Sequence, residues 1–390
     1  MHHGLRQTEH MYMVLVSVAI GLLGGLGAVG LRFFIRFVNS VAWRQGEYTL
    51  DYLRGLPWWW KLAAPAAGGL IVGFIIHYVS REAKGHGVPE VMEAVALRGG
   101  RIRPRVVLAK LFASGISIGS GGSVGREGPI VQIGSALGSV IGQWLKLDER
   151  RLRTLVGCGA AAGIAGAFNA PVAGALFAVE IILGDFGVSQ FSPIVISSVA
   201  ATVVSRHFLG DFPAFTVPTY SLVNPNELLG YVLLGVLAAA VAVAFIRVLY
   251  AGEDFFEKIR LHAAPKALVG GLFVGAIGIW APGVFGVGYE AINDALSNSA
   301  TWHYMLLLVG LKIIAVSITI GSGGSGGIFA PSLFIGAMLG GALGTVMHGI
   351  WPASTAAAGA YALVGMGAVV AGATHAPITA ILIIFELTND

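Results

Sequence analysis

The chain contains one glycine-rich phrase twice: Gly119-Ser-Gly-Gly-Ser-Val-Gly-Arg-Glu-Gly-Pro129 and, 202 positions later (321 − 119), Gly321-Ser-Gly-Gly-Ser-Gly-Gly-Ile-Phe-Ala-Pro331. Each copy stands between two apolar runs, so each predicts flexible backbone between two hydrophobic helices. A lysine precedes each copy by nine positions, Lys110 in the first (119 − 110) and Lys312 in the second (321 − 312). The shared spacing indicates that the two phrases are copies of one segment.

A second pair of phrases has nearly the same offset. Ala165-Gly-Ala-Phe-Asn-Ala-Pro-Val172 corresponds to Ala371-Gly-Ala-Thr-His-Ala-Pro-Ile378, and a glutamate follows each, Glu180 and Glu386. The prolines are 206 positions apart (377 − 171), so we interpret the chain as a duplication. In a membrane protein, such a duplication predicts a site at the interface of two repeats, lined by broken helices.

Composition places the chain in the membrane. Of its 390 residues, 56% are hydrophobic and 11% are charged, against roughly 25% charged residues in a soluble domain. Mean hydropathy is +0.79. Several apolar runs are shorter than the ~20 residues that cross a bilayer, which predicts tilted, half-spanning or re-entrant helices. The runs that we expect to be helical are 11–38, 58–79, 106–118, 130–145, 155–183, 192–209, 228–250, 263–280, 305–320, 328–350, 357–371 and 377–387.

Other classes of function lack the sequence features they need. The net charge of +4 lies in loops, which indicates a topology signal or lipid headgroup contacts rather than nucleic-acid binding. The single Cys158 excludes an intramolecular disulfide. Matches to G-x-G-x-x-G occur outside any strand–helix unit, and no Walker lysine, zinc or nucleophile motif is present. We therefore expect no enzyme, no catalytic residue, no metal site and no cofactor.

The duplicated phrase has the chemistry of an anion site. In 125–129 and 327–331, glycines precede a proline that can begin a helix, which leaves backbone N–H groups free to point outward. Gly85-His-Gly-Val-Pro-Glu90 has the same arrangement. The N-terminus of a helix carries partial positive charge and attracts anions. One such phrase alone is typical of an ordinary capped helix break, but three together predict helix dipoles that converge on a dehydrated anion.

These three phrases, in this order, closely resemble the anion-binding signatures of the CLC family of chloride channels and chloride/proton antiporters. The run from Asn169 to Glu180 matches as well, and the likeness covers nearly the whole chain. It implies an all-α, polytopic integral membrane protein of the cell membrane. It further implies two inverted-topology repeats, here 1–210 and 211–390, and a homodimer with one chloride pathway in each subunit. Carried over by position, the anion-binding residues are Gly85, His86, Gly87, Val88, Gly125, Arg126, Gly128, Gly327, Ile328, Phe329 and Ala330.

Glu127 matches the gating glutamate of the family, whose carboxylate can occupy an anion site until it is protonated or displaced. The residue chemistry agrees, because an acid among anion-attracting amides competes directly with the transported ion. We therefore expect protonation to open the pathway. The alternative is a carboxylate that only stabilises the N-terminus of its helix. Arg126 beside it is expected either to stabilise anions or to hold the loop.

The sequence departs from the family pattern at three places. Ile181 stands where antiporters commonly have a glutamate that relays protons, and His86 replaces a common serine. An imidazole can donate a hydrogen bond as a neutral group or add charge, unless its side chain turns aside. The chain ends at Asp390, before the helix that usually supplies a tyrosine to the central anion site. We read the repeat-matched Glu180 and Glu386 as residues that hold helix ends together.

The resulting hypothesis is passive, channel-like chloride conduction gated by Glu127. The alternative is a proton-coupled chloride antiporter whose internal proton route avoids Ile181. Membrane lipid and small anions are the other expected partners. An ATP-driven transporter would need a nucleotide-binding motif that the sequence lacks.

Overall fold

The computed structural model describes residues 2–211, 215, 217–218, 220 and 222–388. Within the first predicted repeat the chain forms helices of very different length, from six to 42 residues. The boundary between the two repeats, which we placed after residue 210, stays a prediction. The helices of this part are α1 (His2–Trp43), α2 (Leu50–Gly55), α3 (Trp58–Tyr78), α4 (Val88–Leu97), α5 (Arg105–Gly119), α6 (Glu127–Trp144), α7 (Glu149–Phe168), α8 (Pro171–Phe177) and α9 (Val188–Leu209).

The second predicted repeat is also helical, and the described part of the chain contains no β-strand. Its helices are α10 (Leu228–Lys258), α11 (Ala263–Trp280), α12 (Tyr289–Leu296), α13 (Trp302–Gly321), α14 (Phe329–Ile350), α15 (Ala358–Thr374) and α16 (Pro377–Thr388). The all-α class is therefore confirmed. The short helices α4 and α12 lie outside the apolar runs from which helices were predicted.

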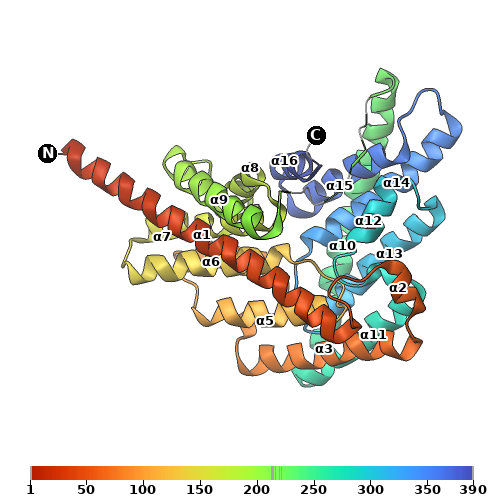
Figure 1. The fold of residues 1–390 in the computed structure, drawn as a ribbon, viewed down its shortest axis with the longest axis horizontal. Coiled ribbons are helices and arrows are strands. Elements are labelled where there is room, and N and C mark those ends of the chain that lie inside the picture. The colour runs from red at the N-terminus through yellow and green to blue at the C-terminus, as the bar shows by residue number, and fades with distance from the viewer. Residues whose placement is uncertain (1, 212–214, 216, 219, 221, 389–390) are drawn as a thin grey trace.

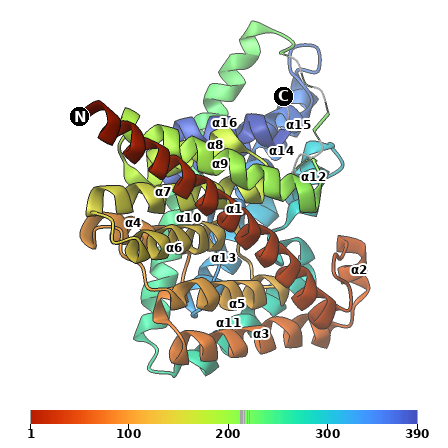
Figure 2. The ribbon, with the colours of Figure 1, turned by 60° about the vertical axis from the view of Figure 1, so that its left-hand side comes forward.

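Helices from the two halves pack against each other in matched pairs. Helix α3 lies along α11 at the lower edge of Figure 1, and the two remain side by side in Figure 2. The short helices α8 and α16 also contact each other. Within each half, α6 packs on α7 and α14 packs on α15. The long α1 runs diagonally across the front of the molecule and contacts α5, α6, α7 and α9 (Figure 1).

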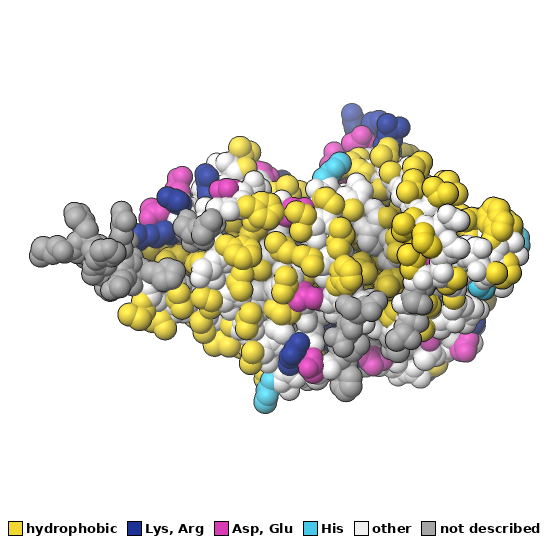
Figure 3. All heavy atoms as spheres, turned by 90° about the horizontal axis from the view of Figure 1, so that it is seen from above, with side chains coloured by type: hydrophobic (Ala, Val, Ile, Leu, Met, Phe, Trp, Pro, Cys, Tyr) yellow, Lys and Arg dark blue, Asp and Glu magenta, His cyan; other side chains and the backbone are white. Residues whose placement is uncertain are grey.

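The surface is that of a multi-pass membrane protein. In the described part of the chain, seven segments are long and apolar enough to cross a bilayer: Met11–Trp43, Trp58–Tyr78, Gln190–Leu209, Pro225–Lys258, Ala263–Trp280, Trp302–Gly321 and Phe329–Ile350. Figure 3 shows a face covered mostly by hydrophobic side chains, with most charged side chains toward its margins. Such a continuous apolar surface is stable when it faces lipid rather than water.

The expected apolar helix over 155–183 is broken in the structure. The second half has an equivalent break between α15 and α16. Helix α7 ends before Asn169, which has a left-handed φ of 60°, and α8 begins at Pro171. In the second half α15 ends before His375, with φ 56°, and α16 begins at Pro377. A proline begins a helix well but cannot continue one, and the residue before it avoids helical conformation. The prediction of one continuous run over 155–183 was therefore wrong.

The repeat-matched lysines have equivalent, fully buried positions. Lys110 donates hydrogen bonds from Nζ to the carbonyl oxygens of Ala83, at 3.2 Å, and Gly85, at 2.8 Å. Lys312 donates to the carbonyl oxygens of Val284 and Gly286, at 3.1 and 2.8 Å. Each lysine thus fixes the loop that precedes a short helix, α4 in the first half and α12 in the second.

Candidate anion pathway

The three glycine–proline phrases meet at one place in the fold. The N–H of Gly125 donates to the carbonyl of Gly327 at 2.7 Å, and the N–H of Gly327 donates to the carbonyl of Gly125 at 2.6 Å. The N–H of Gly85 donates to the carbonyl of Gly324 at 3.2 Å. The carbonyl of Gly85 accepts from the N–H of Gly326, also at 3.2 Å. The beginnings of α4, α6 and α14 are therefore held together by backbone hydrogen bonds between the two halves.

Because of these bonds, the backbone amides that are free differ from those that the sequence predicts. The N–H groups of the glycines that open the three phrases are occupied, contrary to the expectation that they point outward. The free amides come from the first turns of α4, α6 and α14, since the first N–H groups of a helix have no partner within it. They include those of Val88, Gly128 and Phe329, while the first-turn amides of Glu127 and Ala330 face the Glu127 carboxylate. Their partial positive charges lie at the junction of the three helices.

Two glycines are required by the close approach of these loops. A Cβ on Gly128 would collide with the carbonyl oxygen of His86 and would lie 2.9 Å from the Cα of Gly327. Gly87 precedes α4 with φ 86°, a conformation that residues with a side chain rarely adopt. The sequence Gly-His-Gly can therefore place the beginning of α4 directly against the beginning of α6.

Glu127 is fully buried at this junction. Its Oε1 accepts a hydrogen bond from the hydroxyl of Tyr289 at 3.0 Å and lies 3.7 Å from Nε of Arg126. Its Oε2 accepts no hydrogen bond of normal geometry from the described residues. The backbone N–H of Ala330, in the first turn of α14, lies close to the carboxylate. The carboxylate thus occupies a position that suits an anion.

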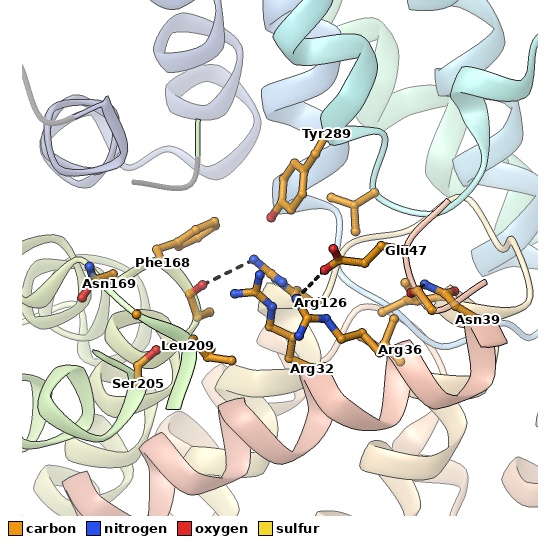
Figure 4. Close-up of a pocket in the computed structure, with 16 residues that line it drawn as sticks. Arg32, Arg36, Asn39, Glu47, Arg126, Phe168, Asn169, Ser205, Leu209 and Tyr289 are labelled. Carbon is orange, nitrogen blue, oxygen red and sulfur yellow. Dashed lines mark hydrogen bonds and ion pairs between the residues drawn. The ribbon is translucent and has the colours of Figure 1, made fainter. Parts of the chain in front are cut away.

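A cavity of about 290 Å³ lies on the Tyr289 side of this carboxylate. Arg32, Arg36 and Arg126 line it together with Tyr289, and we call it the arginine cavity. Figure 4 shows the three guanidinium groups gathered below the ring of Tyr289. The guanidinium of Arg126 also lies over that ring, 5.2 Å from its centre.

A second cavity, of about 530 Å³, contains Glu127 itself in its lining. His86 and His375 line it, and we call it the histidine cavity. Because Glu127 lines one cavity and its hydrogen-bond partner Tyr289 lines the other, the bond between them lies between the two spaces. The fully buried carboxylate therefore stands at the boundary of the two cavities.

The other predicted site residues divide into two groups. Those that line the histidine cavity are His86, Val88, Gly128, Ile181, Ile328 and Phe329. Those that line neither cavity are Gly85, Gly87, Gly125, Gly327 and Ala330. His86, with 9% of its surface exposed, is among the residues that line the histidine cavity.

Glu180 and Glu386 hold helix ends together, as predicted. Glu180 accepts hydrogen bonds from the backbone N–H groups of Ile378, at 3.3 Å, and Thr379, at 2.7 Å, at the beginning of α16. Glu386, on α16, accepts from the N–H groups of Val172 and Ala173 at the beginning of α8, at 3.0 and 2.6 Å. Each carboxylate therefore caps a helix of the other half.

Sequence reasoning missed Tyr289 and its loop. Gly286-Val-Gly288-Tyr289 is the repeat counterpart of Gly85-His-Gly87-Val88, offset by 201 positions (286 − 85). Its loop is fixed by Lys312 as the first is by Lys110. The Gly-x-Gly pattern, repeated at this offset, could have predicted this loop from the sequence. Tyr250 of α10, which lines the histidine cavity, had no such signal.

Comparison with known proteins identifies the family. The model of the voltage gated chloride channel family matches residues 68–390. A putative chloride channel protein ClcB-like of Ralstonia nicotianae is 36% identical over 380 residues, which cover 96% of this chain and 89% of that protein. The chain belongs to the voltage gated chloride channel family. The resemblance to CLC proteins is therefore confirmed, and so is the multi-pass membrane character.

Other relatives agree with this assignment. An H(+)/Cl(-) exchange transporter ClcA of Vibrio vulnificus is 32% identical over 391 residues, covering 97% of this chain and 82% of the relative. The X-ray structure of a slow cyanobacterial Cl-/H+ antiporter superposes with a TM-score of 0.86 at 24% identity, covering 97% of this chain and 89% of the other. These relatives are named as channels and transporters rather than enzymes. Their bacterial origin agrees with the expected cell membrane.

Proposed function

We propose that this family member lets chloride and related anions pass between the arginine cavity and the histidine cavity, with Glu127 as the gate. The observation that carries the proposal is the position of the Glu127 carboxylate, fully buried at the boundary of the two cavities. An anion that crosses from one cavity to the other must displace this carboxylate or wait until it is protonated. The first-turn amides of α4, α6 and α14 provide the attraction for the displaced or replacing charge.

Partial charges on amides suit a transport site better than full charges do. They replace the water of a dehydrated anion without binding it so tightly that it cannot leave. The described residues that line the histidine cavity include neither lysine nor arginine. The lining residues with polar side chains are His86, Glu127, Glu180, Tyr250, Thr374 and His375. Protonation of Glu127 removes the competing negative charge, so acid conditions open the pathway.

Passive conduction is the form of transport that the residues favour. Ile181 faces the histidine cavity and carries no proton. Its neighbour Glu180 lines the same cavity, but its carboxylate is used by the backbone of α16. The side that would deliver protons to Glu127 therefore lacks the acid that antiporters commonly place there, and chloride would move without an exchanged proton.

Proton-coupled antiport is the second candidate. Relatives such as the Vibrio vulnificus protein are named as H(+)/Cl(-) exchange transporters, and both His86 and His375 line the cavity on the Ile181 side of the gate. Imidazoles there would have to replace the missing acid as proton carriers. The homodimer implied by the family resemblance stays a prediction for either candidate.

Chloride efflux from proteoliposomes tests the gate. We expect Glu127→Ala to raise efflux at neutral pH and to make it independent of pH, because the variant has no carboxylate to displace or protonate. The control is Glu257→Ala, which removes an exposed carboxylate of α10 and should leave the pH dependence of the wild type. Efflux that is unchanged by Glu127→Ala, or that stays pH-dependent, would show that Glu127 is not the gate.

A further inference from the structure

The arginine cavity has more positive charge than its own carboxylates balance. Arg36 forms an ion pair with Glu47. Arg126 faces Glu127, with Nε 3.7 Å from Oε1. Arg32 forms no ion pair with any residue in the described part of the chain, although it lines the same cavity. One guanidinium charge is thus left over in the lining of this cavity.

The surplus charge is placed beside charges of the same sign. Arg32 and Arg36 are one helical turn apart on α1, so their side chains share a face of that helix. Arg32 lies close enough to Arg36 and Arg126 for the three cations to repel each other. Nε of Arg36 and Nε of Arg126 are also buried without a hydrogen-bond partner among the described residues. An anion in the cavity would offset the repulsion and satisfy these donors.

The donor geometry of the cavity favours an oxoanion over a single chloride. The cavity, of about 290 Å³, has room for an ion of that kind. Guanidinium groups are planar forks that bind two oxygens of one anion at a time, which a spherical halide cannot use. Asn39 and Ser205 also line the cavity, but their side chains donate to the carbonyl oxygens of Gly46 and Gly166, so the arginines are the chief anion ligands.

We propose that the arginine cavity is a binding site for one small soluble oxoanion of the sulfate or phosphate class, held chiefly by Arg32, Arg36 and Arg126. The occupant is soluble rather than a lipid headgroup because loops and helix ends surround the cavity: the loop at Gly46 and Glu47, the end of α7 at Phe168, the end of α9 at Leu209 and the loop before Tyr289. Oxoanion binding in this cavity does not require that chloride passes through it. Only its consequence, that a bound oxoanion obstructs chloride on this side of Glu127, rests on the proposed function.

Calorimetric titration of the full chain in a neutral detergent tests the site, with sodium sulfate as the probe and sodium chloride as the comparison titrant. Wild type should bind one sulfate per chain, more tightly than chloride. Arg32→Gln should weaken sulfate binding roughly tenfold or more, since it removes a charged hydrogen-bonding partner. Arg32→Lys, which keeps the charge but loses the fork, should lie between the two. Arg260→Gln, which removes an exposed charge beyond α10, should bind as wild type does.

Two results would overturn the proposal: no sulfate binding by wild type, or equal weakening in Arg32→Gln and Arg260→Gln. If Arg32→Gln elutes as an aggregate in size-exclusion chromatography, the comparison of Arg32→Lys with Arg260→Gln decides in its place. Sulfate present on both sides of the membrane should also slow chloride efflux through wild type more than through Arg32→Lys. Sulfate binding without any effect of Glu127→Ala on efflux would refute the gate and leave the oxoanion site standing.

Discussion

Replacement of Tyr289 by phenylalanine isolates one hydrogen bond of the closed gate. Its hydroxyl donates to Oε1 of Glu127 at 3.0 Å, while its ring packs edge-on against Phe215, with centres 5.2 Å apart, and under the guanidinium of Arg126. Phenylalanine keeps both ring contacts and removes only the donor. The change therefore acts on the closed arrangement of the carboxylate with little effect on the surrounding packing.

The size of the effect of Tyr289→Phe on the gate follows from the negative charge of the Glu127 carboxylate, which accepts the hydrogen bond. A hydrogen bond to a charged group contributes about 1.5–3 kcal/mol, and removal of one partner leaves the buried acceptor unsatisfied. Loss of that amount from the closed state multiplies the ratio of open to closed gates by roughly 10 to 150. If the wild-type gate is mostly closed at neutral pH, chloride efflux from Tyr289→Phe proteoliposomes should rise by about tenfold or more under the same conditions.

A double variant separates this account from a general loosening of the structure. With Glu127→Ala in place, the hydroxyl of Tyr289 has no carboxylate to hold, so adding Tyr289→Phe should leave efflux unchanged. Reduced efflux in Tyr289→Phe alone, or an equal gain with and without Glu127, would refute the reasoning. Coupled residues are expected to be non-additive in this way, whereas independent ones add.

Two further predictions concern the architecture that positions the gate. Glu386→Ala should lower the free energy of unfolding by about 1–2 kcal/mol, because it removes the cap of α8, and Glu180→Ala should have a similar effect at α16. Denaturant titration in detergent measures both, and a loss in only one would argue against equivalent caps. Gly128→Ala should destabilise the fold by about 1–3 kcal/mol and impair efflux through overpacking against the loop of His86, whereas Gly310→Ala, which meets nothing within 4 Å, should not. Equal thermal midpoints for the two glycine variants would contradict the close approach at Gly128.

The sequence was sufficient to predict the parts of the site that the duplication repeats. The equal spacing from Lys110 and Lys312 to the glycine phrases corresponds to equivalent lysine positions in the structure. The glutamates at matched positions, Glu180 and Glu386, cap each other's half as predicted. Repetition is informative because two copies of one segment fold under the same local constraints.

Contacts between the halves were harder to predict. The pairing of Gly125 with Gly327 depends on how closely two loops approach, and no local pattern specifies which glycine amides are consumed there. Arg32 and Arg36 lie some ninety residues before Glu127, and their spacing of four shows only that they share a helix face. Tyr289 was hidden because a valine occupies the corresponding position, Val88, in the first half.

The reversal potential of the purified protein in liposomes tests the central claim most directly. It is measured under a fixed chloride gradient, first at equal pH and then with an opposing pH gradient. Passive conduction predicts that the potential stays at the chloride equilibrium value in both cases, for wild type and for Glu127→Ala. A shift with the pH gradient in wild type would contradict passive conduction and would require a proton route that avoids Ile181, with His86 and His375 as the first residues to replace.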